Sequence, residues 1–95
     1  MGIELIEAYR LEIRQIAERH GATSIRVFGS VARGDAGPQS DVDFLVTVGG
    51  PTSPWFPGGL VADLEELLDR RVQVVTEEGL HDLLRDQILS EAVPV

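Results

Sequence analysis

Two aspartates, separated by a single residue, are the side chains in this sequence that most directly suggest chemistry. Asp41 and Asp43 open an apolar segment that has the alternation of a β-strand. Because side chains alternate along a strand, both carboxylates leave the same face, with Cα atoms about 6 to 7 Å apart. Magnesium prefers hard oxygen ligands and often takes one or two carboxylates together with substrate phosphates. The pair is compatible with a magnesium site, although an isolated Asp-Val-Asp is more often two solvated loop aspartates.

The segment before this pair offers the groups that a phosphate needs. Gly29 and Ser30 follow an expected strand and open a short helical turn. Glycine lets a phosphate approach the backbone, and the free amides of the turn and the Ser30 hydroxyl can donate hydrogen bonds to it. Arg33, one turn later, can neutralise a phosphate oxygen. Alone, Gly29-Ser30 would be an ordinary tight turn; beside the aspartate pair it indicates a metal and nucleotide site.

Hydrophobic periodicity predicts the elements that position these residues. Apolar spacing of helical period indicates helices over residues 3–19, 60–69 and 80–88, and alternation or β-branched runs indicate strands over residues 24–28, 41–48 and 72–76. Gly21 is expected to stop the first helix, and Thr76 to cap the last one. The predicted order is helix, strand, helical turn, strand, helix, strand, helix.

The segment from residue 49 to 59 is rich in proline and glycine and is expected to be an extended connection. Trp55 and Phe56 are its two large apolar residues. The more common use of such aromatics is to anchor a loop on the core, and the alternative is contact with a base or a protein partner. Anchoring is the prediction for both.

Composition narrows the class of protein. Ninety-five residues, 43% of them hydrophobic, are expected to form a single domain, residues 1–95, and the lack of cysteine excludes a disulfide framework or a thiolate metal site. No apolar run reaches the roughly 20 residues of a membrane span, so a cytoplasmic protein is expected. The net charge of -8 disfavours direct nucleic-acid binding and fits a protein partner with a basic face, or acidity that serves only solubility.

Three short motifs carry a family resemblance. Gly29-Ser30, Ala32-Arg33-Gly34 and Ser40-Asp41-Val42-Asp43 together resemble the signature of polymerase-beta-like nucleotidyltransferases. The similarity is greatest to the minimal nucleotidyltransferases, and it extends to the first helix, which ends in Gly21, and to the strand-helix junction at residues 71–80. The resemblance therefore covers essentially the whole chain.

This resemblance implies an α+β fold with a small mixed sheet, and transfer of AMP or another nucleotidyl group from Mg-ATP to an acceptor hydroxyl. It implies that Gly29 and Ser30, with Arg33 and Ser40, hold the nucleoside triphosphate, and that Asp41 and Asp43 hold the magnesium ions. Members without further domains are commonly antitoxins, whose partner is a HEPN-type ribonuclease toxin. The resemblance is compatible with a homodimer as well as with a hetero-oligomer.

One position departs from the family pattern. The third carboxylate of such enzymes is carried by the strand at residues 72–76, where this chain has Gln73. An amide oxygen can face a metal but adds no net charge and is a poor base. Glu77 lies about 13 Å further along an extended strand, and Asp35 lies in a loop that nothing in the sequence positions. An alignment of this strand that is wrong by two residues is the remaining alternative.

Several functions follow from these observations. The favoured one is an enzyme that modifies a protein partner, and the second is an antitoxin that has lost catalysis and acts by binding alone. Transfer to a small molecule such as an aminoglycoside would require a substrate site that so short a chain supplies only across a dimer. A templated polymerase is disfavoured by the acidity of the chain.

Overall fold

The structure, a computed structural model, describes residues 3–95. In this range, helices and strands follow one another in the predicted order, with the first helix divided in two and a short strand added at the end. They are α1 (Glu4–Ala8), α2 (Arg10–Arg19), β1 (Ala22–Phe28), α3 (Gly29–Arg33), β2 (Val42–Val48), α4 (Gly58–Leu68), β3 (Val72–Thr76), α5 (Asp82–Glu91) and β4 (Val93–Pro94). The predicted α+β class is confirmed.

The four strands form one mixed sheet in the order β3-β2-β1-β4. β1 is antiparallel to β2 and to β4, whereas β2 and β3 are parallel. β2 is one of the two interior strands, and its residues Phe44, Leu45 and Val46 are all buried. Three consecutive buried residues mean that both faces of β2 are covered, as is usual for a strand inside a sheet with helices on both sides.

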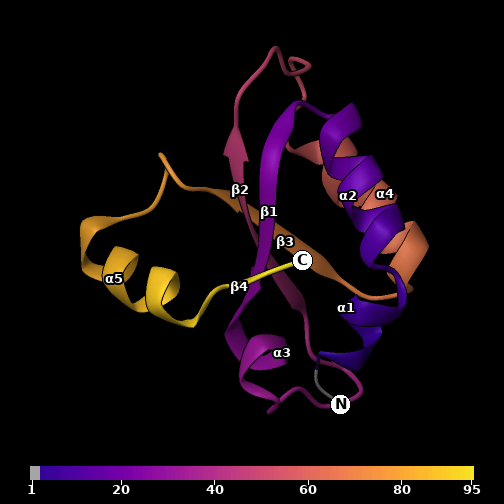
Figure 1. The fold of residues 1–95 in the computed structure, drawn as a ribbon, viewed down its shortest axis with the longest axis vertical. Helices are drawn as coiled ribbons and strands as arrows, with labels where there is room; N and C mark the ends of the chain where they lie inside the picture. The colour runs from indigo at the N-terminus through magenta and orange to yellow at the C-terminus, as the bar shows by residue number, and fades with distance from the viewer. Residues whose placement is uncertain (1–2) are drawn as a thin grey trace.

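Four of the helices lie on the two sides of the sheet, and α3 lies at the end of β1 (Figure 1). α1, α2 and α4 cover one face of the sheet, and α5 lies on the opposite side. On the first face, α2 buries Ile13, Ile16 and Ala17, the apolar positions that helical spacing predicted. α4 buries Leu60, Leu64 and Leu68 at the same spacing. The core between these helices and the sheet fixes where the strand ends lie.

The predicted first helix is interrupted at Tyr9. This residue has φ -117° and ψ 21°, outside the helical region, so α1 ends before it and α2 begins after it. Ile6 of α1 is nevertheless buried in the same core as α2. The break therefore changes the path of the chain. Tyr9, which helical spacing placed on the apolar face, is exposed at the break, and the other predicted apolar positions face the core. In the part of the chain that the structure describes, no helix is both long and apolar enough to cross a bilayer.

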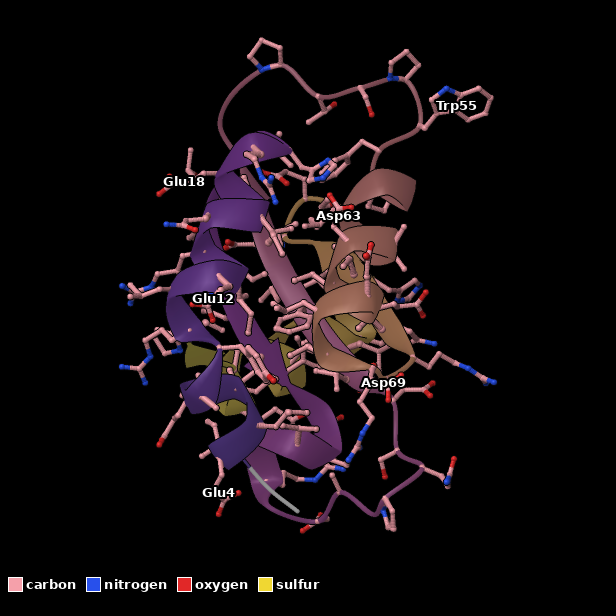
Figure 2. All side chains as sticks on the ribbon, turned by 90° about the vertical axis from the view of Figure 1, so that its right-hand side faces the viewer. Glu4, Glu12, Glu18, Trp55, Asp63 and Asp69 are labelled. Carbon is pink, nitrogen blue, oxygen red and sulfur yellow. The ribbon has the colours of Figure 1, made fainter. Side chains whose placement is uncertain are left out.

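Two predictions about local structure were wrong. Trp55 is 83% exposed and projects from the 49–57 connection (Figure 2), whereas Phe56 packs against the core. The turn at this point sends the two neighbouring side chains in different directions, so only one anchors the loop. Thr76 does not cap α5: its hydroxyl accepts from the Gly79 amide, and the cap is His81, whose Nδ1 accepts from the Leu83 amide at 3.2 Å.

Candidate functional site

Three strand ends meet at one edge of the sheet and bring the predicted site residues together. β1 ends at this edge where β2 begins, because the two strands are antiparallel, and β3 begins there because it is parallel to β2. The register pairs Phe28 with Asp43, and Asp43 with Gln73. Paired residues on neighbouring strands point to the same face of the sheet. Gln73 therefore lies beside Asp43, and Gly29 follows directly at the end of β1.

Gly29 is required at this edge for two independent reasons. Its φ is +74°, in the left-handed region that favours glycine, and a Cβ atom there would overlap Oδ2 of Asp43. The backbone thus turns from β1 into α3 in direct contact with the Asp43 carboxylate. The short separation between the glycine corner and the aspartate pair, which the sequence suggested, is present in the structure.

The aspartate pair is short of positive charge. Burial raises the pKa of the Asp43 carboxyl, and the charge of Asp41 raises it further; Arg33 opposes these effects, and Glu91 adds a smaller increase. Two carboxylates that repel each other at a partly buried edge are stabilised by a cation between them. The donor set fits magnesium, since this ion needs only one or two carboxylates when phosphates and water complete its shell.

Within residues 3–95, no group of three or more histidine, cysteine, aspartate or glutamate side chains is arranged to hold a metal ion. The residue paired with Asp43 on β3 is Gln73, a neutral amide. Residues two positions away on this strand are Arg71 and Val75, so a shifted alignment would not supply an acid either.

Arg33 lies at the end of α3 and is held by two carboxylates. Its Nε donates to Asp35 at 3.1 Å, and its Nη1 donates to both oxygens of Glu91 at 3.2 and 3.3 Å. Asp35, one of the two acids considered as a replacement third ligand, is thus engaged with Arg33. Its amide also donates to the carbonyl of Ser30 at 2.9 Å. Ser30 is half-buried at the start of α3, next to Gly29.

Ser40 shapes the loop that delivers the aspartates. Its hydroxyl accepts from the Gly37 amide at 2.8 Å, and its own amide donates to the Gly37 carbonyl at 3.1 Å. Ser40 and Asp41 also line a polar groove with Arg70 and Arg71. The contacts of Ser40 show a role in closing the turn, and its predicted contact with nucleotide stays a prediction.

A family model, described as nucleotidyltransferase domain, matches residues 10–95. The chain belongs to this nucleotidyltransferase family. The matched range includes every residue of the sheet edge described above.

Relatives of this nucleotidyltransferase extend the likeness to nearly its full length. A candidate protein adenylyltransferase of Methanocaldococcus jannaschii is 39% identical over 90 residues, which cover 95% of this chain and 97% of that protein. A solved structure of a candidate minimal nucleotidyltransferase has a TM-score of 0.86 and 43% identity, and the match covers 100% of this chain and 97% of the other. The resemblance to minimal nucleotidyltransferases is confirmed.

A more distant likeness shows the fold alone. A chain in the complex of a tri-AMPylated Shewanella oneidensis HEPN toxin with an MNT antitoxin has a TM-score of 0.70 at 18% identity. That match covers 93% of this nucleotidyltransferase and 69% of the other chain.

Glu77, the other acid considered as a third ligand, is engaged elsewhere in the nucleotidyltransferase. Its carboxylate contacts Arg26 at 3.1 Å, the Thr47 hydroxyl at 3.1 Å and Arg85 at 3.6 Å. These partners lie on β1, β2 and α5, so Glu77 ties the last helix to the sheet. It does not complete the aspartate pair.

Sequence reasoning missed Glu91, the last residue of α5. One of its oxygens, Oε1, accepts from the Gly29 amide at 3.1 Å and from Arg33 at 3.2 Å. The Gly29 amide was expected to face a phosphate, and in the nucleotidyltransferase structure it donates to this carboxylate. No motif or spacing in the sequence marks Glu91, which is 62 positions from Gly29; only the packing of α5 beside α3 brings them together.

Proposed function

We propose that this nucleotidyltransferase transfers AMP from Mg-ATP to a hydroxyl of a protein partner, and that it is the antitoxin that neutralises a HEPN-type toxin. The observation that carries the transfer is the Asp41–Asp43 pair, which lies against Gly29 and in register with Gln73. The name of the Methanocaldococcus jannaschii relative supports a protein as acceptor, and the fold shared with a toxin and antitoxin complex supports the partner.

Each residue of the site has a proposed task. Asp41 and Asp43 hold the magnesium ions, with the Gln73 amide oxygen beside them. Burial and then the charge of Asp41 raise the pKa of the Asp43 carboxyl, and a bound cation would offset that repulsion. Ser30 and the backbone at the start of α3 receive the triphosphate, Arg33 offsets its charge, and Ser40 keeps the aspartates in place. When bound, magnesium supplies charge stabilisation at the phosphates.

The proposed transfer forms one bond and breaks another at the α-phosphorus of ATP. The acceptor oxygen forms a bond to the α-phosphorus of ATP, the bond from that phosphorus to the bridging oxygen breaks, and pyrophosphate leaves. The proton of the acceptor hydroxyl must be taken up by a carboxylate or by water, because the amide of Gln73 is a poor base. Positioning and charge compensation by the chain therefore contribute most of the catalysis.

The setting follows from the same proposal. Residues 1–95 act as a single domain in the cytoplasm, with the toxin bound directly and no direct contact to nucleic acid. A net charge of -8 favours a partner with a basic contact face. The proposed assembly is a hetero-oligomer of this chain with the toxin, and it is compatible with a homodimer of this chain inside that assembly.

The test is incubation of the purified chain with ATP, magnesium and a HEPN-type protein as the partner. We expect AMP-sized mass additions on the partner. The double variant Asp41→Asn, Asp43→Asn keeps the size of both side chains and is expected to abolish the additions. Asp86→Asn, which removes a carboxylate from the exposed side of α5, is the matched control and retains them. A wild-type chain that binds nucleotide and leaves the partner unmodified would refute the transfer.

Gln73 favours one alternative, an antitoxin that acts by binding alone. Loss of the third carboxylate weakens the metal site without affecting a protein contact elsewhere. In this case, the Asp41→Asn, Asp43→Asn variant neutralises the toxin as well as wild type does. Under the proposed function, the same variant binds the toxin and fails to neutralise it, so a growth assay with a pull-down separates the two.

A further inference from the structure

Helix α5 is attached to the molecule by polar contacts near its two ends. None of its residues is buried, and Leu83 and Leu84 are 85% and 52% exposed. Near its start, Arg85 contacts the carbonyl and carboxylate of Glu77. At its end, Glu91 contacts Gly29 and Arg33. Figure 1 shows the helix standing apart from the layer of α1, α2 and α4. The position of α5 therefore depends on specific side chains.

We propose that Glu91 is a positioning residue, which holds Arg33 at the Gly29-Ser30 corner so that its guanidinium faces the polyphosphate of the nucleotide. The inference deepens the proposed function and rests on it. A single oxygen of Glu91 accepts from the Gly29 amide at 3.1 Å and from Arg33 Nη1 at 3.2 Å. The two donors are therefore held within about 6 Å of each other.

Arg33 needs such a partner because little else fixes it. Its side chain is about half exposed, at 47%, and sits on a helix of only five residues. A long side chain loses substantial rotamer entropy when it is fixed. Asp35 holds Nε and Glu91 holds Nη1, and within residues 3–95 no hydrogen bond engages Nη2. Nη2 is thus presented, already ordered, to a phosphate oxygen, and fixing it before binding raises affinity.

The alternative to positioning is that Glu91 competes with the nucleotide phosphates for the Gly29 amide and Arg33. Its carboxylate is an anion beside the corner where an anionic ligand is proposed, so repulsion alone predicts that removing it tightens nucleotide binding. Positioning predicts weaker binding of ligands with a polyphosphate and little change for AMP, because Arg33 is assigned to the phosphates beyond the first. The two mechanisms therefore give opposite signs in one measurement.

The experiment compares wild type, Glu91→Ala and Asp86→Ala as full-length chains by calorimetry with magnesium and either the non-hydrolysable analogue AMP-PNP or AMP. We expect Glu91→Ala to weaken AMP-PNP binding about tenfold, the loss typical of a charge-assisted contact, and to change AMP binding less than about twofold. Asp86→Ala, which removes a carboxylate from the same helix, leaves both unchanged. Glu91→Gln serves in place of alanine if the latter fails to fold.

A double-mutant cycle tests whether Glu91 acts through Arg33. In an Arg33→Ala background, Glu91→Ala is expected to have no further effect on AMP-PNP binding. Tighter binding by Glu91→Ala, an equal loss for AMP and AMP-PNP, or a full effect in the Arg33→Ala background would each overturn the inference.

A nucleotide-free measurement separates this inference from the proposed function. In ¹⁵N spectra, the Nη resonances of Arg33, assigned with Arg33→Lys, are expected to be those of an ordered guanidinium in wild type and Asp86→Ala, and of a mobile one in Glu91→Ala. If wild type binds no nucleotide, the proposed function fails. If Arg33 is equally mobile in all three proteins, the positioning role of Glu91 fails on its own.

Discussion

Replacing Gln73 by aspartate places a third carboxylate beside Asp43, on the same face of the sheet. The two positions are paired across the parallel β2–β3 ladder, and neighbouring strands lie about 4.8 Å apart. Because Gln73 is exposed, the new charge acts through a water-like dielectric, and Coulomb's law gives a repulsion of about 1 kcal/mol at low salt. Without metal, Gln73→Asp is therefore expected to unfold about 4 to 8 °C below wild type.

Magnesium is expected to reverse this loss. The added carboxylate attracts the ion, and a tenfold tighter dissociation constant corresponds to about 1.4 kcal/mol of extra stability at saturating metal. It also offers a base for the acceptor hydroxyl, so AMP transfer is expected to increase.

Thermal unfolding followed by circular dichroism, at low ionic strength with and without magnesium, measures both effects. Gln73→Asn is the matched control, since it has the size of aspartate and no charge. If the two variants melt alike under both conditions, position 73 does not face the metal site beside Asp43, and the placement of the third ligand is wrong.

Three further predictions concern stability. Gly29→Ala is expected to lower the free energy of unfolding by about 1 to 2 kcal/mol because of its left-handed backbone, and further because its Cβ overlaps Asp43. Gly34→Ala, at φ +82° with open space around it, is expected to lose only the backbone contribution. Equal losses for both variants in urea unfolding would contradict the steric argument. Asp43→Asn is expected to stabilise the metal-free protein at neutral pH. The folded-state pKa of Asp43 is raised, so the stability that its protonated carboxyl contributes is fully present below the unfolded pKa of about 4 and is lost as pH rises through the folded pKa. The gain from Asp43→Asn is therefore expected to vanish at about pH 2, and a gain that persists there would show another cause. Phe56→Ala is expected to cost about 2 kcal/mol and Trp55→Ala less than about 0.5 kcal/mol in thermal unfolding, and a similar cost for both would mean that Trp55 packs.

Local patterns predicted the elements well because the core enforces them. The leucine spacing of α4 is helical: Leu60, Leu64 and Leu68 are buried, and Val61 and Leu67 pack against the core while partly exposed. The strand predicted over residues 72–76 has those bounds in the structure. The proximity of Gly29 to Asp43 also follows from local sequence, since the two residues flank one antiparallel pairing.

Interactions between distant segments could not be predicted in the same way. Thr76 and His81 are both residues that can cap a helix, and the choice of His81 depends on the turn in which the Thr76 hydroxyl binds Gly79. Trp55 and Phe56 have similar hydrophobicity, and only the path of the loop decides which one packs. Glu91 reaches Gly29 through the placement of α5, which no periodicity encodes.

The antiparallel pairing of β1 with β2 alone brings Gly29 and Asp43 together. Gly29 and Asp43 belong to the continuous β1–α3–β2 segment, in which Gly29 directly follows the Phe28–Asp43 pair, whereas Gln73 and Glu91 come from later segments of the chain. Single substitutions in these later segments leave the β1–β2 pairing in place. Variants at Gln73 and Glu91 are therefore expected to change the proposed metal and nucleotide contacts while the strands that carry the aspartates stay folded.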